Sequence, residues 1–225
     1  MSSRDNPLWL QLWRDKQIDF HQLRVNQYLA RFWPGIDHPQ GSRVFVPLCG
    51  KSLDMIWLAE QGHEVIGVEL SPLAVKAFFK ENRLRPVKRR MGDFTLWEHG
   101  RIRILCGDFF SLGKVDIGHI DTVYDRAALT ALPEDIRKLY AAHLQRLMPE
   151  TSDIFLLTIE DAEDGAVLAL AAEVDEEVRS LYGDAFDIKL THVERVFEPD
   201  PEAPDQPPQQ AEYKVYRLSS RKAAG

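Results

Sequence analysis

Acidic residues follow three apolar runs of this chain that have the length of buried strands. Glu69 directly follows the run 65–68, and Asp108 and Asp125 follow two later runs. The carboxyl ends of parallel strands meet at one edge of a sheet, where ligands bind, and an acid there can accept a hydrogen bond from a ribose hydroxyl. We therefore expect these three carboxylates to line one small-molecule site, with Glu69 on the ribose of a nucleoside.

The segment that positions Glu69 predicts a strand, a turn, a helix and a second strand over residues 43–71. Its turn contains one glycine, Gly50. A dinucleotide site needs G-x-G-x-x-G, and a Walker loop needs a further glycine where this chain has Phe45. Neither phosphate-binding loop is therefore present. A nucleoside cofactor without phosphate, S-adenosylmethionine, fits this pattern best.

The other residues near this edge each allow two interpretations. Asp108 either accepts a hydrogen bond from the adenine amino group or only caps the turn that follows it. Phe109 packs either on the adenine or in the core. Lys51 and Ser52 either contact the ligand or only stabilise their own turn.

Asp125 and Arg126 stand where the acceptor of a transferred group would lie, and we assign them as candidate orienting residues. Arg126 could hold an anionic acceptor or the cofactor carboxylate through paired hydrogen bonds. The alternative is a structural acid–base pair at the start of a helix. No histidines or cysteines have metal-ligand spacing, so no metal site is expected. A hydrolase elbow, G-x-S-x-G, is also absent.

The whole sequence predicts an α/β fold. Helices are expected at 6–14, 25–32, 53–58, 73–81, 133–147 and most of 166–182, strands at 44–46, 65–68, 93–97, 101–106, 120–124, 154–159, 186–197 and 213–218, and a solvated bend at 88–90. We predict one Rossmann-like domain over 1–225, with a doubly wound, mostly parallel seven-stranded sheet, an antiparallel C-terminal strand pair and helices on both faces. Residues 199–210 are expected to form a proline-rich loop.

Composition narrows the possible partners. The net charge of −7 argues against a nucleic acid or an acidic membrane surface, since both attract basic patches. Two cysteines provide no disulfide framework, and no apolar run has the length of a membrane span. We expect a soluble, cytoplasmic, monomeric protein that acts on a small molecule.

Several motifs in the first 160 residues resemble the bacterial form of the thiopurine S-methyltransferase family. They are WLQLW with DFHQ and VN within 9–26, VFVPLCGKSLDMIWLAEQGHEVIGVELS at 44–71, CGDFF at 106–110, YDRAAL-x-ALP at 124–133 and RLMP at 146–149. After Glu160 the tyrosine and the proline pair usual in the family are absent. The resemblance therefore covers the cofactor half of the pattern more fully than the acceptor half.

The resemblance implies methyl transfer from S-adenosylmethionine to the sulfur of a small thiol, with S-adenosylhomocysteine as product. Some bacterial members are linked to selenium and tellurium methylation and to tellurite resistance. It also implies that the helical segment 1–40 is a lid over the cofactor. By matching motif, the residues implied to bind the cofactor are Trp13, Leu48, Glu69 and Arg126, with Trp9, Phe20, Gly50, Asp108 and Phe109 close by.

Three alternatives to this function stay open at this point. One is a methyltransferase of the same superfamily that acts on halide, thiocyanate or chalcogen oxyanions. The second is a non-catalytic S-adenosylmethionine-binding protein, suggested by the departure after Glu160. The third is a nicotinamide oxidoreductase, which the single-glycine turn disfavours.

Overall fold

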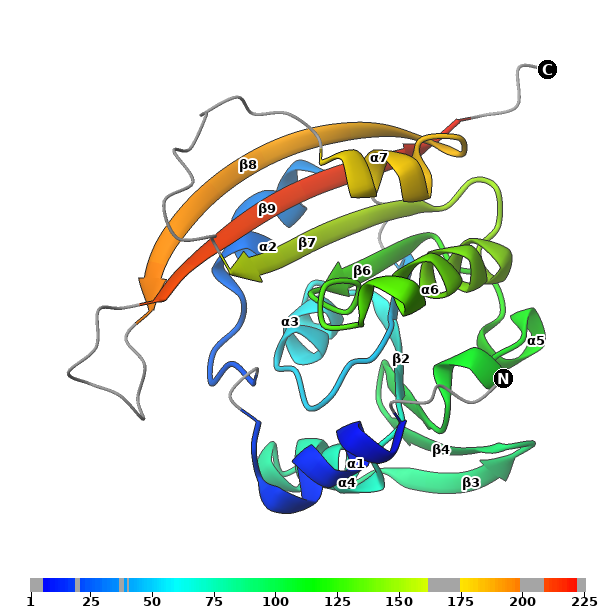
Figure 1. Ribbon diagram of the computed structural model, residues 1–225. Coiled ribbons are helices and arrows are strands. Elements are labelled where there is room, and N and C mark those ends of the chain that lie inside the picture. The colour runs from blue at the N-terminus through cyan, green and yellow to red at the C-terminus, as the bar shows by residue number, and fades with distance from the viewer. Residues whose placement is uncertain are drawn as a thin grey trace. The chain divides into compact units, whose positions relative to one another are not determined.

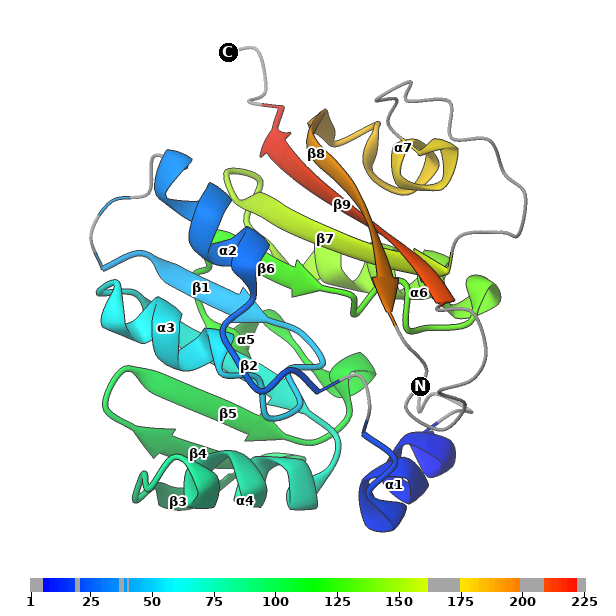
Figure 2. The same cartoon turned by 90° about the vertical axis from the view of Figure 1, so that its left-hand side faces the viewer.

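A computed structural model describes residues 6–18, 21–36, 39, 41–161, 175–198 and 209–221. The chain divides into two compact units, one of Met1–Tyr124 with Gln145–Pro149 and one of Asp125–Leu144 with Glu150–Gly225. The prediction of a single domain over 1–225 stays a prediction, and the two units are described separately here. Figures 1 and 2 show the elements of each unit from two sides.

The first unit is built on parallel strands. β1 (Arg43–Val46) pairs in parallel with β2 (Glu64–Glu69) and with the start of β6 (Thr122–Arg126), and β2 pairs in parallel with β5 (Ile102–Cys106). All but the first residue of both β1 and β2 are buried. Such nearly continuous burial is typical of parallel strands covered on both faces. The strand–turn–helix–strand prediction for 43–71 is confirmed.

The first four helices of this unit begin and end close to the predicted positions, and the short α5 (Lys114–Ile117) was not predicted. The first four are α1 (Asn6–Asp15), α2 (Gln27–Phe32), α3 (Asp54–Glu60) and α4 (Pro72–Glu81), and the unit also has the 3₁₀ turns η1 (Trp33–Gly35) and η2 (Phe109–Ser111). The start of α4 follows from its sequence: the Ser71 hydroxyl accepts a hydrogen bond from the Ala74 N–H, and Pro72 takes the first helical position. Both α3 and α4 contact β2 and β5 (Figure 2).

One local prediction was wrong. The basic segment 88–90, predicted as a solvated bend, lies within strand β3 (Val87–Met91), which pairs antiparallel with β4 (Phe94–His99). The first four side chains of β3 are exposed, so the strand lacks the alternation of apolar residues that would have identified it. β3 ends the strand order β3-β4-β5-β2-β1-β6, and lysine and arginine are common on such edge strands. The predicted β4–β5 hairpin is confirmed.

The second unit contains three long antiparallel strands, β7 (Asp153–Asp161), β8 (Phe186–Glu198) and β9 (Gln209–Ser220), in the order β7-β9-β8. β8 and β9 run side by side, with α7 (Glu176–Tyr182) beside them (Figure 1). Most of α6 (Glu134–Leu147) also belongs to this unit. The antiparallel C-terminal pair is confirmed.

The described residues form nine strands, eight of them at predicted strand positions, and the unpredicted β3 is the ninth, so the sheet has more strands than the seven expected. Of the predicted loop 199–210, residues 199–208 lie outside the described residues, and β9 already includes Gln209. The predicted helical stretch 166–174 also lies outside them. Within the described part of the chain, every helix is too short or too polar to cross a membrane.

Candidate active site

The turn between β1 and α3 is closed by the carboxylate of Glu69. The Gly50 N–H donates to Oε2 at 2.9 Å, and the Ser71 N–H donates to Oε1 at 2.7 Å. Glu69 is 7% exposed, and burial raises its pKa to about 7 even though these hydrogen bonds act in the opposite direction. Each carboxylate oxygen has two lone pairs, so both oxygens can accept a further hydrogen bond. This is the capacity that a ribose with two hydroxyls requires.

Three N–H groups of the same turn are used within the protein. Besides Gly50, Cys49 donates to the carbonyl of Val68 at 2.9 Å, and Ser52 donates to the carbonyl of Cys49 at 3.1 Å. A phosphate-binding loop instead points several N–H groups at its ligand. The structure therefore supports the inference that this turn does not hold a phosphate.

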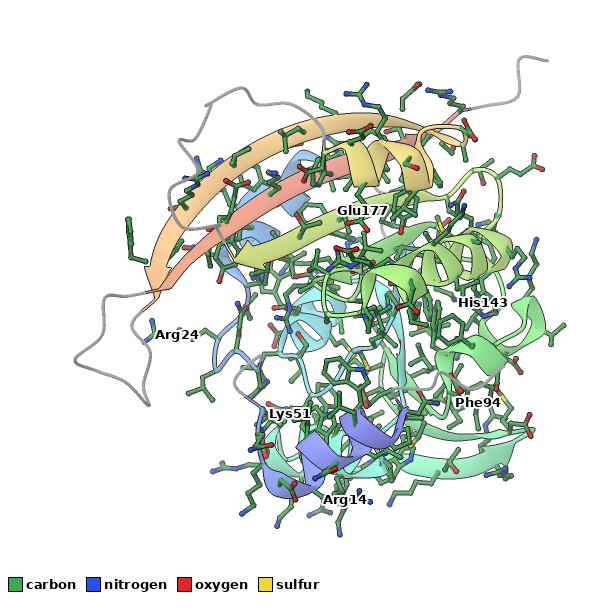
Figure 3. The ribbon with its side chains drawn as sticks, in the orientation of Figure 1. Arg14, Arg24, Lys51, Phe94, His143 and Glu177 are labelled. Atoms are coloured by element: carbon green, nitrogen blue, oxygen red, sulfur yellow. The ribbon has the colours of Figure 1, made fainter. Side chains whose placement is uncertain are left out.

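Lys51, labelled in Figure 3, stabilises the turn by pairing with α4. Its Nζ lies 2.9 Å from Oε2 of Glu81 at the end of that helix. The Ser52 hydroxyl accepts a hydrogen bond from the Asp54 N–H at the start of α3. For both residues these contacts match the interpretation in which they stabilise their own turn.

The backbone of the turn has two left-handed residues, Leu48 with φ 47° and Gly50 with φ 54°. A left-handed conformation is costly for a leucine and persists where the surrounding structure enforces it, often at binding sites. At Gly50 a Cβ atom would lie 3.4 Å from Cζ2 of Trp13, so glycine lets the indole ring pack close to the turn. Trp13 is 8% exposed, and Trp9, on the same helix, is half-buried. Phe20 lies outside the described residues.

Asp108 uses both of its carboxylate oxygens within the first unit. Oδ1 accepts a hydrogen bond from the Phe110 N–H at 2.9 Å, which caps η2. Oδ2 accepts from the side-chain amide of Asn6 at 2.9 Å. Phe109 is 3% exposed and packs edge-on against Phe110. The predicted cap is thus present, and it occupies only one of the two oxygens.

A buried hydrogen-bond network that the sequence analysis missed holds the start of α3, the helix that follows the turn. Asp54, 1% exposed, accepts hydrogen bonds from the Asn26 N–H at 2.8 Å and from the Tyr124 hydroxyl at 2.9 Å. The Asn26 side chain in turn caps α2. The three residues come from three of the motifs named above, and an acid inside an apolar helical pattern was the one local signal. Asp54 therefore fixes the start of α3 to segments 28 and 70 residues away.

In the second unit, Asp125 closes a turn of its own. Its Oδ1 accepts from the N–H groups of Ala128 and Leu129 at 3.0 and 3.3 Å, and its Oδ2 accepts from the Tyr140 hydroxyl at 2.7 Å. The residue is 0% exposed, and burial raises its pKa to about 6 despite these hydrogen bonds. A side chain so enclosed shapes its own turn, and the role of Asp125 as an orienting residue stays a prediction.

Arg126 is half-buried and precedes the left-handed residue Ala127, with φ 57°. The Ala127 N–H donates to the carbonyl of Leu157 on β7 at 2.8 Å, which holds the turn to that strand. The direction of the chain after Arg126 is thus set by two anchors, the Asp125 carboxylate and β7. The contact of Arg126 with an anionic acceptor or with the cofactor carboxylate stays a prediction.

Parallel strands around a single-glycine turn, with a buried acid at the end of the second strand, define a nucleoside-binding domain of the class I methyltransferase type. Solved structures share this fold. Magnesium protoporphyrin IX methyltransferase from Synechocystis PCC 6803, with bound S-adenosylmethionine, has a TM-score of 0.62 at 16% identity and covers 97% of this chain and 99% of its own. The 1,6-didemethyltoxoflavin-N1-methyltransferase of Burkholderia thailandensis, with bound 1,6-didemethyltoxoflavin and S-adenosylhomocysteine, has a TM-score of 0.61 at 18% identity and covers 96% of this chain and 87% of its own.

Comparison of the amino-acid sequence with known proteins establishes the family to which this chain belongs. The family model described as thiopurine S-methyltransferase matches residues 4–222. A protein of Stutzerimonas stutzeri with that name is 59% identical over 224 residues, which is all of this chain and 94% of the other. The chain therefore belongs to the thiopurine S-methyltransferase family, as the motifs at 9–26, 44–71, 106–110 and 124–133 indicated.

Proposed function

We propose that this protein is an S-adenosylmethionine-dependent methyltransferase that transfers a methyl group to the sulfur, selenium or tellurium of a small acceptor. The observation that carries the proposal is the turn between β1 and α3 that the Glu69 carboxylate closes, called the Glu69 turn from here on. It offers carboxylate oxygens to a ribose while its own N–H groups at 49, 50 and 52 are already used. The family assignment supports the same cofactor and places the transfer on sulfur.

Each predicted cofactor residue other than Arg126, which could also hold the cofactor carboxylate, then has a role. Glu69 accepts from the ribose hydroxyls, and Oδ2 of Asp108 accepts from the adenine amino group. Leu48 and Gly50 shape the turn, and Phe109 supports the adenine from the core. The aromatic side chains proposed to cover the cofactor are Trp9 and Trp13 of α1, and the role that the resemblance implies for Phe20 stays a prediction.

The cofactor supplies an electrophilic methyl group on a positively charged sulfur. A thiolate is a strong nucleophile near neutral pH, so the protein needs alignment and exclusion of water more than a strong base. We assign no residue as an essential base. Alignment alone is worth about 7–11 kcal/mol in well-oriented reactions. Arg126, positioned by Asp125, is the proposed contact for the charge of the acceptor.

The two nearest alternatives are less well supported. One is a methyltransferase of the same superfamily that acts on halide, thiocyanate or chalcogen oxyanions. The other is a non-catalytic cofactor-binding protein. Both fit the fold. Neither accounts for 59% identity to a protein named thiopurine S-methyltransferase over all of this chain.

Calorimetry with S-adenosylhomocysteine, followed by turnover of S-adenosylmethionine with an aromatic thiol, tests the proposal. We expect micromolar binding and a methyl thioether product. A parallel panel of iodide, thiocyanate and selenite separates the superfamily alternative. Binding without turnover of any acceptor would favour the non-catalytic alternative, and an absence of binding would overturn the assignment of the Glu69 turn.

A further inference from the structure

The hydrogen bond between Asn6 and Asp108 links the first residue of α1 to the end of β5. The two residues are 102 positions apart in sequence. The Asp108 carboxylate is oriented by its other oxygen, which accepts from the Phe110 N–H. Oδ2 is therefore held at a fixed place and already receives a planar, conjugated NH₂ group.

The side-chain amide of asparagine and the amino group of adenine are chemically alike as donors. Both are NH₂ groups in the plane of a conjugated system, and both donate hydrogen bonds without carrying charge. A carboxylate oxygen that accepts from one of them can accept from the other at the same distance. In the free protein, the Asn6 amide thus occupies one of the hydrogen-bonding positions of Oδ2 that an adenine amino group could use.

We propose that Asn6 determines the affinity and the adenine selectivity of the cofactor site, because its amide competes with the adenine amino group for Oδ2 of Asp108. The inference rests on the cofactor role proposed for Asp108 and deepens it. Binding of the cofactor exchanges one donor for the other. The free energy of the hydrogen bond lost in the protein therefore reduces the free energy gained on binding. A ligand without the amino group leaves the Asn6 contact in place.

The exchange also involves α1 as a whole. The helix contacts the rest of the first unit near both of its ends, through the Asn6 amide at Asp108 and through the Trp13 ring at Gly50. Loss of the first contact on binding leaves the contact of Trp13 with the turn and the packing of α1 against α4. Cofactor binding is therefore coupled to the position of the first turn of α1.

The test is calorimetry with two ligands and two variants. The ligands are S-adenosylhomocysteine and its analogue with hydrogen in place of the adenine amino group. Asn6→Ala should bind S-adenosylhomocysteine about twofold to tenfold more tightly than the wild type, the worth of one net hydrogen bond. It should bind the analogue with unchanged affinity.

The matched background is Asp108→Ser, which keeps a cap oxygen for η2 and removes the oxygen that faces Asn6. In that background, Asn6→Ala should change neither affinity. A second measurement uses the wild type alone: the Asn6 side-chain amide resonance, assigned from Asn6→Ala, should shift with S-adenosylhomocysteine and stay in place with the analogue.

Two results would overturn the proposal. One is weaker binding of S-adenosylhomocysteine by Asn6→Ala, which would make Asn6 a support for the site. The other is an equal change for both ligands. A wild type that binds neither ligand would instead contradict the proposed function, so the two failures are distinguishable.

Discussion

The Glu69 turn, between β1 and α3, and the Asp125 turn, after β6, are built alike and differ in the groups that donate to their carboxylates. Each follows a strand, each holds a buried carboxylate that accepts backbone N–H groups, and each has a left-handed residue that is not glycine, Leu48 or Ala127. The difference is the Tyr140 hydroxyl, which donates to Asp125, whereas Glu69 is bonded only to backbone N–H groups in its described contacts.

We interpret that difference as the one between a carboxylate that binds ligand and a carboxylate that positions its neighbour. Glu69 retains 7% exposure and Asp125 retains none. A carboxylate with unused lone pairs at a partly open edge can take ligand hydroxyls, whereas one enclosed by a turn and a tyrosine cannot reach them. Similar local geometry thus serves two tasks, and changing one side chain at a time tests the division.

The largest effect is expected at Glu69. Glu69→Ala removes the acceptor of two ribose hydroxyls, and hydrogen bonds to a charged group are worth about 1.5–3 kcal/mol each. We expect S-adenosylhomocysteine to bind at least about a hundredfold more weakly in calorimetry. Glu69→Gln keeps the shape of the side chain without its charge and should lose about tenfold. Unchanged affinity in the alanine variant would contradict the ribose role.

The next largest effect is expected at Arg126, on turnover of the acceptor. Arg126→Ala should lower kcat/KM about tenfold or more for an aromatic thiol that carries a carboxylate, because a charge-assisted pair is lost. The same thiol without the carboxylate should lose less, and Arg126→Lys should fall between because it keeps the charge without the planar fork. Equal losses for both thiols would show that Arg126 does not match acceptor charge.

The sequence predicted the parts of this site that depend on local pattern. The positions of Glu69, Asp108 and Gly50, at or just after the end of a strand or in the turn between strand and helix, were predicted correctly, and their roles in binding stay predictions. The Asp54 network and the Asp125–Tyr140 bond were not predictable in this way. Their partners lie 28, 70 and 15 residues away, and only tertiary packing brings them together. Strand β3 was missed because an edge strand needs no buried side chains.

Tyr140 tests the positioning role of Asp125. Tyr140→Phe removes the hydroxyl that donates to a fully buried carboxylate, so the free energy of unfolding in urea should fall by about 2 kcal/mol. Tyr182→Phe is a matched control, because its buried hydroxyl has no hydrogen-bond partner among the described residues and should cost little. S-adenosylhomocysteine affinity should stay within about twofold in both variants. A large loss of that affinity in Tyr140→Phe would show that the Asp125 turn also contributes to cofactor binding.

A smaller effect follows from the pKa of about 7 at Glu69. Ribose hydroxyls donate to the ionised carboxylate, so binding favours the deprotonated form and releases a proton. Affinity for S-adenosylhomocysteine should therefore rise about tenfold between pH 6 and pH 8 and then level off. Calorimetry in buffers of different ionisation enthalpy counts the released proton directly. Glu69→Gln should remove this dependence, and a wild-type affinity that is flat over the range would contradict it.

The smallest effect is expected at Lys51, although Gly50-Lys51-Ser52 matches the end of a phosphate-binding loop. Lys51 pairs with Glu81, whose side chain is 53% exposed, and such partly exposed pairs contribute about 0.2–1 kcal/mol. Lys51→Ala and Glu81→Ala should therefore lower the free energy of unfolding by similar small amounts and leave S-adenosylhomocysteine affinity within about twofold. A lysine that held a phosphate would behave differently, with a large loss of affinity for Lys51→Ala alone. That result would overturn the view that the Glu69 turn selects a nucleoside by its ribose.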